Sequence, residues 1–61
     1  MKELIKFKEA LNNCADAVDK VIEATKREEA GEEITEKEME KINDDMILAF
    51  VKLQILSQQL N

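Results

Sequence analysis

The stretch Lys26–Met39, KREEAGEEITEKEM, contains the signals that end one helix and begin another. Gly31 is the only glycine in the chain and follows a run of helix-forming residues. Glycine adopts, at little cost, the left-handed conformation that commonly ends a helix. Lys26 and Arg27 precede it, where cations suit the negative end of the helix dipole. We therefore predict a first helix over residues 2–30.

A second helix is predicted to begin at Thr35. Thr35 is followed three residues later by Glu38, which is the sequence pattern of a capping box. Ile34 and Met39 flank the same position at the spacing of a hydrophobic staple. The two patterns agree on one helix start, so the predicted cap of the second helix is Thr35 with Glu38.

The connection between the predicted helices, residues 31–34, is short. A helix over residues 35–60 must then return alongside the first one, in the opposite direction. The chain has no proline, and Ala, Glu, Lys, Leu and Ile dominate it, which is typical of long helices. Residues 1–61 are expected to form a single all-α domain, an antiparallel two-helix hairpin.

Apolar residues recur in both predicted helices at alternating steps of three and four, which places them along one stripe of each helix. When the chain folds about the turn, the two stripes face each other. Ala10, Ala17 and Ala24 flank the first stripe and would let a neighbouring helix approach closely, as in a helical bundle. The residues expected in the hairpin core are Leu4, Phe7, Leu11, Cys14, Val18, Val21, Met39, Ile42, Met46, Ala49, Phe50, Leu53, Leu56 and Leu60.

The second helix carries more apolar residues than one stripe can hold. Between Met46 and Leu56 only Lys52 and Gln54 are polar. Burying four leftover aliphatic side chains represents roughly 6–10 kcal/mol, comparable with the whole stability of a small domain. We therefore expect self-association, first as a four-helix bundle dimer with coiled-coil-like packing and second as a higher oligomer. The residues expected at an interface with another copy or a partner are Ile47, Leu48, Val51, Ile55 and Ile5.

The size of the chain also favours association. A domain of 61 residues is marginally stable unless disulfides, a metal, oligomerisation or very regular helix packing supports it. One cysteine and no histidine exclude an internal disulfide and the ordinary zinc ligand sets. Cys14 is accordingly expected to be a small buried hydrophobic residue. Helix packing and oligomerisation remain as sources of stability.

The net charge is −5 and it is unevenly distributed. Residues 23–45 hold ten acidic and four basic side chains, whereas residues 46–61 hold only Lys52. This balance argues against direct nucleic-acid binding, which needs Lys and Arg at the phosphates, and against binding to an anionic membrane surface. No apolar run is long enough to span a bilayer. Because no signal peptide is evident and the thiol is free, we expect a cytoplasmic location.

Glu32, Glu33 and Glu36 are spaced as EExxE, which resembles the first metal-binding motif of the all-α nucleotide pyrophosphohydrolases. The resemblance implies a divalent cation and a phosphate-containing substrate. In that family the motif lies within a helix and an ExxD pair follows it. Here the three residues straddle the predicted turn and no ExxD pair follows. We predict no catalytic residue, metal site or cofactor, and we do not expect an enzyme.

The remaining functional class is a small interaction protein. We expect a regulator, adaptor or inhibitor that binds another macromolecule, of the kind frequent among bacterial and phage accessory proteins. One alternative is an acidic mimic that blocks a nucleic-acid-binding protein, because the acidic residues gather in one part of the chain. Another is an oligomer that holds a small ligand between its subunits, since a pocket formed at an interface has no linear signature.

Overall fold

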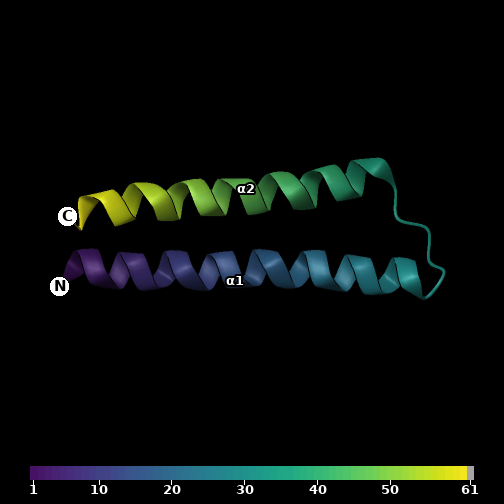
Figure 1. Ribbon diagram of the computed structural model, residues 1–61, viewed down its shortest axis with the longest axis horizontal. Coiled ribbons are helices and arrows are strands. Elements are labelled where there is room, and N and C mark those ends of the chain that lie inside the picture. Colours follow the sequence, from purple (N-terminus) through teal and green to yellow (C-terminus); the bar gives the residue numbers. More distant parts are fainter. Residues whose placement is uncertain (61) are drawn as a thin grey trace.

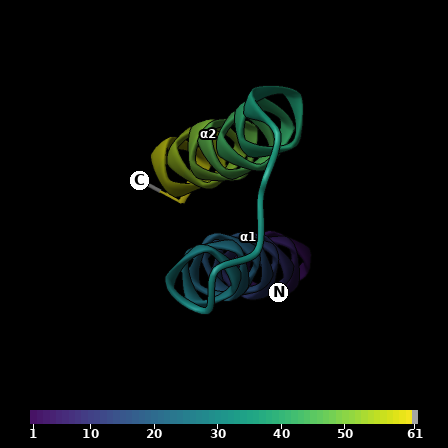
Figure 2. The same ribbon diagram turned by 90° about the vertical axis from the view of Figure 1, so that its right-hand side faces the viewer.

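The structure, a computed structural model, describes residues 1–60 and contains two helices, α1 (Lys2–Glu29) and α2 (Glu36–Gln59). The helices run side by side in opposite directions, so that both termini lie at the end away from the turn (Figure 1). Seen along its length, the molecule has one helix in each of two layers (Figure 2). The Cα atoms extend over 46 × 16 × 12 Å. The predicted antiparallel hairpin is confirmed, and each helix end lies within one residue of its expected position.

The end of α1 forms as the sequence indicates. Gly31 has a φ of 91°, in the left-handed region that glycine tolerates. Its N–H donates to the carbonyl oxygen of Glu28 at 3.0 Å. The N–H of Glu32 donates to the carbonyl oxygen of Arg27 at 2.9 Å. These two bonds are the Schellman motif, and they satisfy carbonyl groups that the helix end leaves without partners.

The start of α2 forms one half of the expected capping box. The Thr35 hydroxyl oxygen accepts a hydrogen bond from the backbone N–H of Glu38 at 3.1 Å. Within residues 1–60, the reciprocal hydrogen bond from the Thr35 N–H to the Glu38 carboxylate does not form. The Glu38 carboxylate is drawn instead to Arg27, which donates to it at 3.0 Å. A full charge opposite the carboxylate is a stronger partner than a backbone amide.

Small side chains make up the buried part of the molecule. In residues 1–60 the buried positions are Ala10, Cys14, Ala17 and Ala24, all on α1. The α2 stripe that faces them is half-buried. It consists of Met39, Ile42, Met46, Ala49, Leu53 and Leu56.

Four residues expected in the hairpin core are exposed instead. Leu4, Leu11, Phe50 and Leu60 have between 38% and 58% of their surface accessible, whereas Phe7, Val18 and Val21 are half-buried. For Leu4 and Leu11 the difference is a rotation of α1 about its own axis. The expected core combined the row of Phe7, Cys14 and Val21 with the row of Leu4, Leu11 and Val18. The structure pairs the first row with the alanines on its other side, because alanines allow the two backbones to come closer.

Candidate interaction surfaces

A row of apolar side chains, exposed at Leu4 and Leu11 and half-buried at Val18, runs along α1 beside its buried row. Leu4, Leu11 and Val18 recur every seven residues, a spacing that keeps them on one side of a helix. Leu11 and Val18 each lie four residues after a member of the buried row, and residues four apart are neighbours on a helix surface. The row therefore borders the contact with α2.

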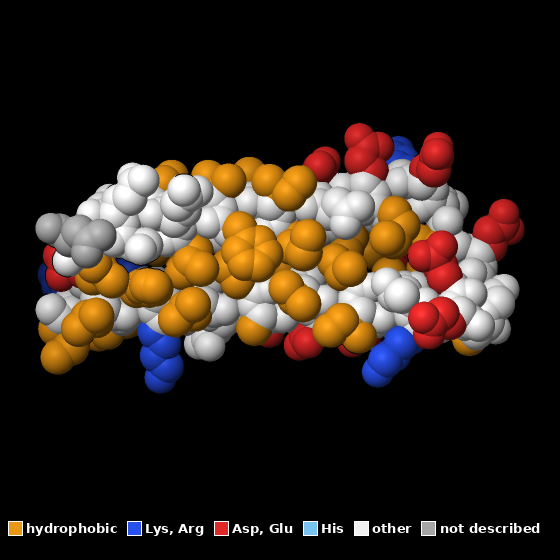
Figure 3. Space-filling model, in the orientation of Figure 1, with side chains coloured by type: hydrophobic (Ala, Val, Ile, Leu, Met, Phe, Trp, Pro, Cys, Tyr) orange, Lys and Arg blue, Asp and Glu red, His pale blue; other side chains and the backbone are white. Residues whose placement is uncertain are grey.

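α2 contributes to the same side of the hairpin. Phe50 lies four residues after the half-buried Met46, just as Leu11 lies four after Phe7. Both helices are right-handed and they run antiparallel, so this offset displaces each side chain toward the same face of the hairpin. Hydrophobic side chains follow the seam between the helices on this face and extend onto α1, whereas the C-terminal part of α2 is polar there (Figure 3). We call it the apolar face, and its principal members are Leu4, Leu11, Val18, Ile22 and Phe50.

A second apolar surface lies on the side of α2 that points away from α1. In the sequence, its members lie between the half-buried positions of α2. Their helical spacing places them on the side of α2 that is remote from α1. Each is between 44% and 57% exposed. We call this surface the outer stripe, and it consists of Ile47, Leu48, Val51 and Ile55.

Ile5 was expected to share an interface with the outer stripe. It is exposed, but it lies two residues before Phe7 and therefore almost half a helical turn away from the contact with α2. The outer stripe lies on the opposite side of the hairpin. The structure therefore separates Ile5 from the stripe, with both helices between them.

The face opposite the apolar face is polar. A groove between the helices on this side is lined by Lys6, Glu9, Ala10, Asn13, Ala49, Lys52 and Leu56. Lysine stems extend over its apolar floor, with their charged ends free to stay in water. The groove also shows the alignment of the helices, because Asn13 of α1 and Ala49 of α2 lie at nearly the same height.

An ion-pair cluster joins the two helices at the turn. The Arg27 guanidinium donates to Glu38 of α2 at 3.0 Å and to Glu32 of the turn at 3.2 Å. The hydrogen bond to Glu38, followed by the one to Glu32, raises the pKa of Arg27 above its ordinary value. Sequence reasoning assigned Arg27 only to the end of α1. Its link to Glu38 was missed because it depends on how the turn returns the chain.

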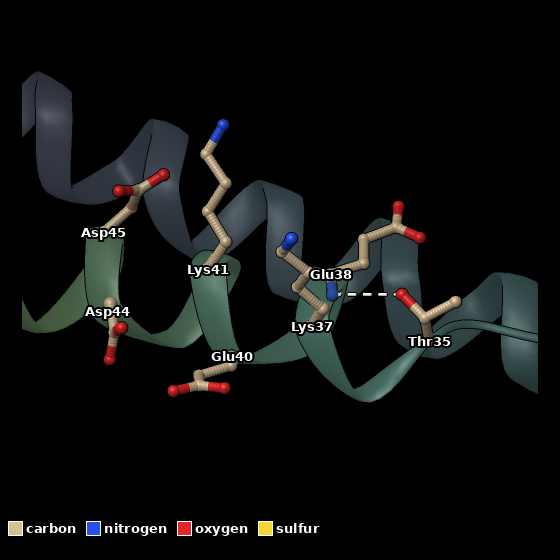
Figure 4. Close-up of a pocket in the computed structure, with 7 residues that line it drawn as sticks. All are labelled: Thr35, Lys37, Glu38, Glu40, Lys41, Asp44 and Asp45. Atoms are coloured by element: carbon tan, nitrogen blue, oxygen red, sulfur yellow. Dashed lines mark hydrogen bonds between the residues drawn. The ribbon is translucent and has the colours of Figure 1, made fainter.

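The acidic segment at the start of α2 mixes charges of both signs. Lys41 and Asp45 project to one side of the helix, and Glu40 and Asp44 project to the other (Figure 4). These residues belong to one helix and form an open surface. Over residues 1–60, no three acidic or thiol side chains are grouped so that they would hold a metal ion. Of the EExxE residues, Glu32 and Glu33 lie in the connection and Glu36 begins α2.

Two further features bear on the choice of function. Cys14 is a free thiol buried in the contact between the helices. Across residues 1–60 neither helix combines the length and apolarity needed to cross a membrane. In comparisons with known proteins, no family model, curated protein or solved structure matches the chain. The two apolar surfaces and the uneven charge distribution are therefore the features of the molecule that bear on function.

Proposed function

We propose that this chain is a small non-enzymatic protein that works as an oligomer and acts by binding another macromolecule, as a regulator, adaptor or inhibitor. The observation that carries the proposal is the distribution of large apolar side chains. The described residues bury only alanines and a cysteine, while eleven large hydrophobic side chains are exposed. Isolated apolar residues on a surface are ordinary, but contiguous ones commonly mark an interaction site.

The exposed residues lie on two sides of the hairpin, which supports two kinds of contact. A two-fold contact between copies uses the same patch on each subunit and covers one side only. If that contact covers the apolar face, the outer stripe of α2 remains free. Its aliphatic side chains fit an apolar stripe on a helix of another protein.

Two measurements test the proposal. Sedimentation equilibrium should show a defined oligomer at micromolar concentration, and a strictly monomeric protein would contradict it. For the second contact, immobilised wild-type protein and the Val51→Glu, Ile55→Glu double variant are exposed to the same extract of cells that express the gene. A specific partner should bind the wild type and be lost from a double variant that remains an oligomer. Equal capture by both proteins would argue against the outer stripe.

The acidic turn end supports a second candidate, a mimic that blocks a nucleic-acid-binding protein. Ten of the 14 acidic residues fall within residues 23–45, and acidic side chains gather at the turn end of the molecule (Figure 3). A basic partner held in this way should dissociate steeply as salt is raised, because exposed charges are screened. Capture that is unchanged by salt would exclude this candidate, and it would favour the outer stripe.

A further inference from the structure

We infer that the apolar face is the contact with a second copy of this chain, in a four-helix bundle where the two hairpins run in opposite directions. The inference rests on the proposed function, since it specifies which surface self-associates and how. The sequence pattern assigned this role to the outer stripe because Leu4 and Leu11 were expected in the hairpin core. Their exposure changes the choice: the apolar face includes both helices, whereas the outer stripe occupies half of one.

The surface area favours a second copy as the occupant. The chain exposes 5060 Å², whereas a compact monomer of 7.0 kDa exposes about 4000 Å². The excess of roughly 1000 Å² slightly exceeds the ~800 Å² that each partner buries in an interface of standard size. An identical hairpin has the same length of 46 Å and presents an apolar face of the same extent.

The charge distribution selects the orientation. The turn end, residues 23–45, carries ten acidic and four basic side chains, and the rest of the chain carries four acidic and five basic. Two hairpins placed turn against turn would bring the two acidic ends together, which is unfavourable. With the hairpins reversed, each acidic end lies beside the nearly neutral, slightly basic end of the other copy.

The reversed arrangement also pairs the residues of α1 well. It sets α1 against α1 of the partner, so that Leu11 packs on the partner's Val18 and Leu4 lies opposite the partner's Thr25. The two-fold axis then crosses α1 midway between Leu11 and Val18.

The same axis also crosses α2. The axis crosses α1 between Cys14 and Ala15, one to two residues beyond Asn13. Since Asn13 and Ala49 line one groove and the helices are antiparallel, the axis crosses α2 between Ile47 and Leu48. Phe50 lies within one helical turn of this point, so its ring packs close to the centre of the contact.

Charge substitutions compare the two apolar surfaces directly. Leu11 and Val51 are similarly exposed, so Leu11→Glu and Val51→Glu place the same charge on the apolar face and on the outer stripe. By sedimentation equilibrium, Leu11→Glu should raise the dimer dissociation constant by about tenfold or more, because it would bury an unpaired charge. Val51→Glu should leave the constant unchanged. The reverse result would overturn the inference while leaving self-association intact, and a monomeric wild type would overturn both.

A cysteine pair keeps the test decisive if Leu11→Glu does not fold. In a Cys14→Ala background, the double variant Leu11→Cys with Val18→Cys and the double variant Leu48→Cys with Ile55→Cys are each oxidised under mild conditions and analysed by denaturing electrophoresis. The first variant should form covalent dimers at least about ten times faster, because Leu11 meets the partner's Val18 and only side chains that meet satisfy disulfide geometry. Turn-against-turn packing would place α1 beside α2 of the partner, so the first variant would then not link. Equal or reversed rates would overturn the inference.

Discussion

At the scale of single residues, the turn depends on a few local choices. Gly31 supplies a positive φ, the Thr35 hydroxyl caps α2, and Arg27 joins α1 to α2 through Glu38. Gly31 and Thr35 act through the nearby backbone, which is why these two were evident in the sequence. Arg27 was not, since its partner lies eleven residues away across the turn.

Replacing the cap should weaken α2 measurably. Thr35→Ala leaves the Glu38 N–H without its acceptor and should lower the free energy of unfolding by about 1 kcal/mol. Urea denaturation followed by circular dichroism measures the loss. Thr35→Ser is the matched control, because it keeps the hydroxyl and should remain near the wild type. If Thr35→Ala and Thr35→Ser were equally stable, the cap would have no energetic role.

Gly31→Ala should also destabilise the protein. A Cβ at this position meets no atom within 4 Å, so crowding cannot contribute and only the backbone conformation opposes it. A left-handed conformation costs an L-residue roughly 1–2 kcal/mol. The thermal midpoint should fall for Gly31→Ala and fall less for Gly31→Asn, since asparagine tolerates this region better. An unchanged midpoint for the alanine variant would mean that the turn readily adopts another conformation.

At the scale of helices, the contact between α1 and α2 depends on small side chains. Ala10, Ala17 and Ala24 face α2 and are buried, with Ala24 only 2% exposed. Larger residues in these places would hold the helices apart. The sequence identified the alanines as a flank that permits close approach, but it placed the adjacent leucines in the core.

Enlarging one of these alanines tests the packing. Ala24→Leu inserts a side chain for which the contact has no room and should destabilise the fold by about 1–3 kcal/mol. Asn12→Leu adds the same side chain at an exposed position of α1 and should cause no loss, because leucine is also the better helix former. Chemical denaturation of both variants provides the comparison. Equal stability of the two would show that Ala24 does not face α2 closely.

At the scale of the whole molecule, the buried positions among residues 1–60 are three alanines and Cys14, whereas eleven large hydrophobic side chains are exposed. Most of these exposed side chains lie on the apolar face and on the outer stripe. If a second copy covers the apolar face as proposed, the chain obtains part of its stability from that copy. Folding and association are then linked, as in obligate dimers.

This linkage predicts that stability depends on concentration. Raising the protein concentration by about a hundredfold should raise the thermal midpoint, because unfolding then also requires dissociation. Differential scanning calorimetry over that range measures the effect. Val51→Glu should retain the concentration dependence, and Leu11→Glu should lose it or unfold. A midpoint that is independent of concentration for the wild type would contradict association.

The sequence alone determined the two helices, their ends and their antiparallel return. These depend on local chemistry: the left-handed glycine, the threonine cap and a connection too short to allow another path. Only the tertiary structure decided which side of α1 faces α2. Phe7, Cys14 and Val21 lie between the leucine row and the alanine row, so either row completes an apolar stripe of suitable width. The close approach that the alanines allow decides the choice, and it leaves Leu4 and Leu11 exposed on the hairpin.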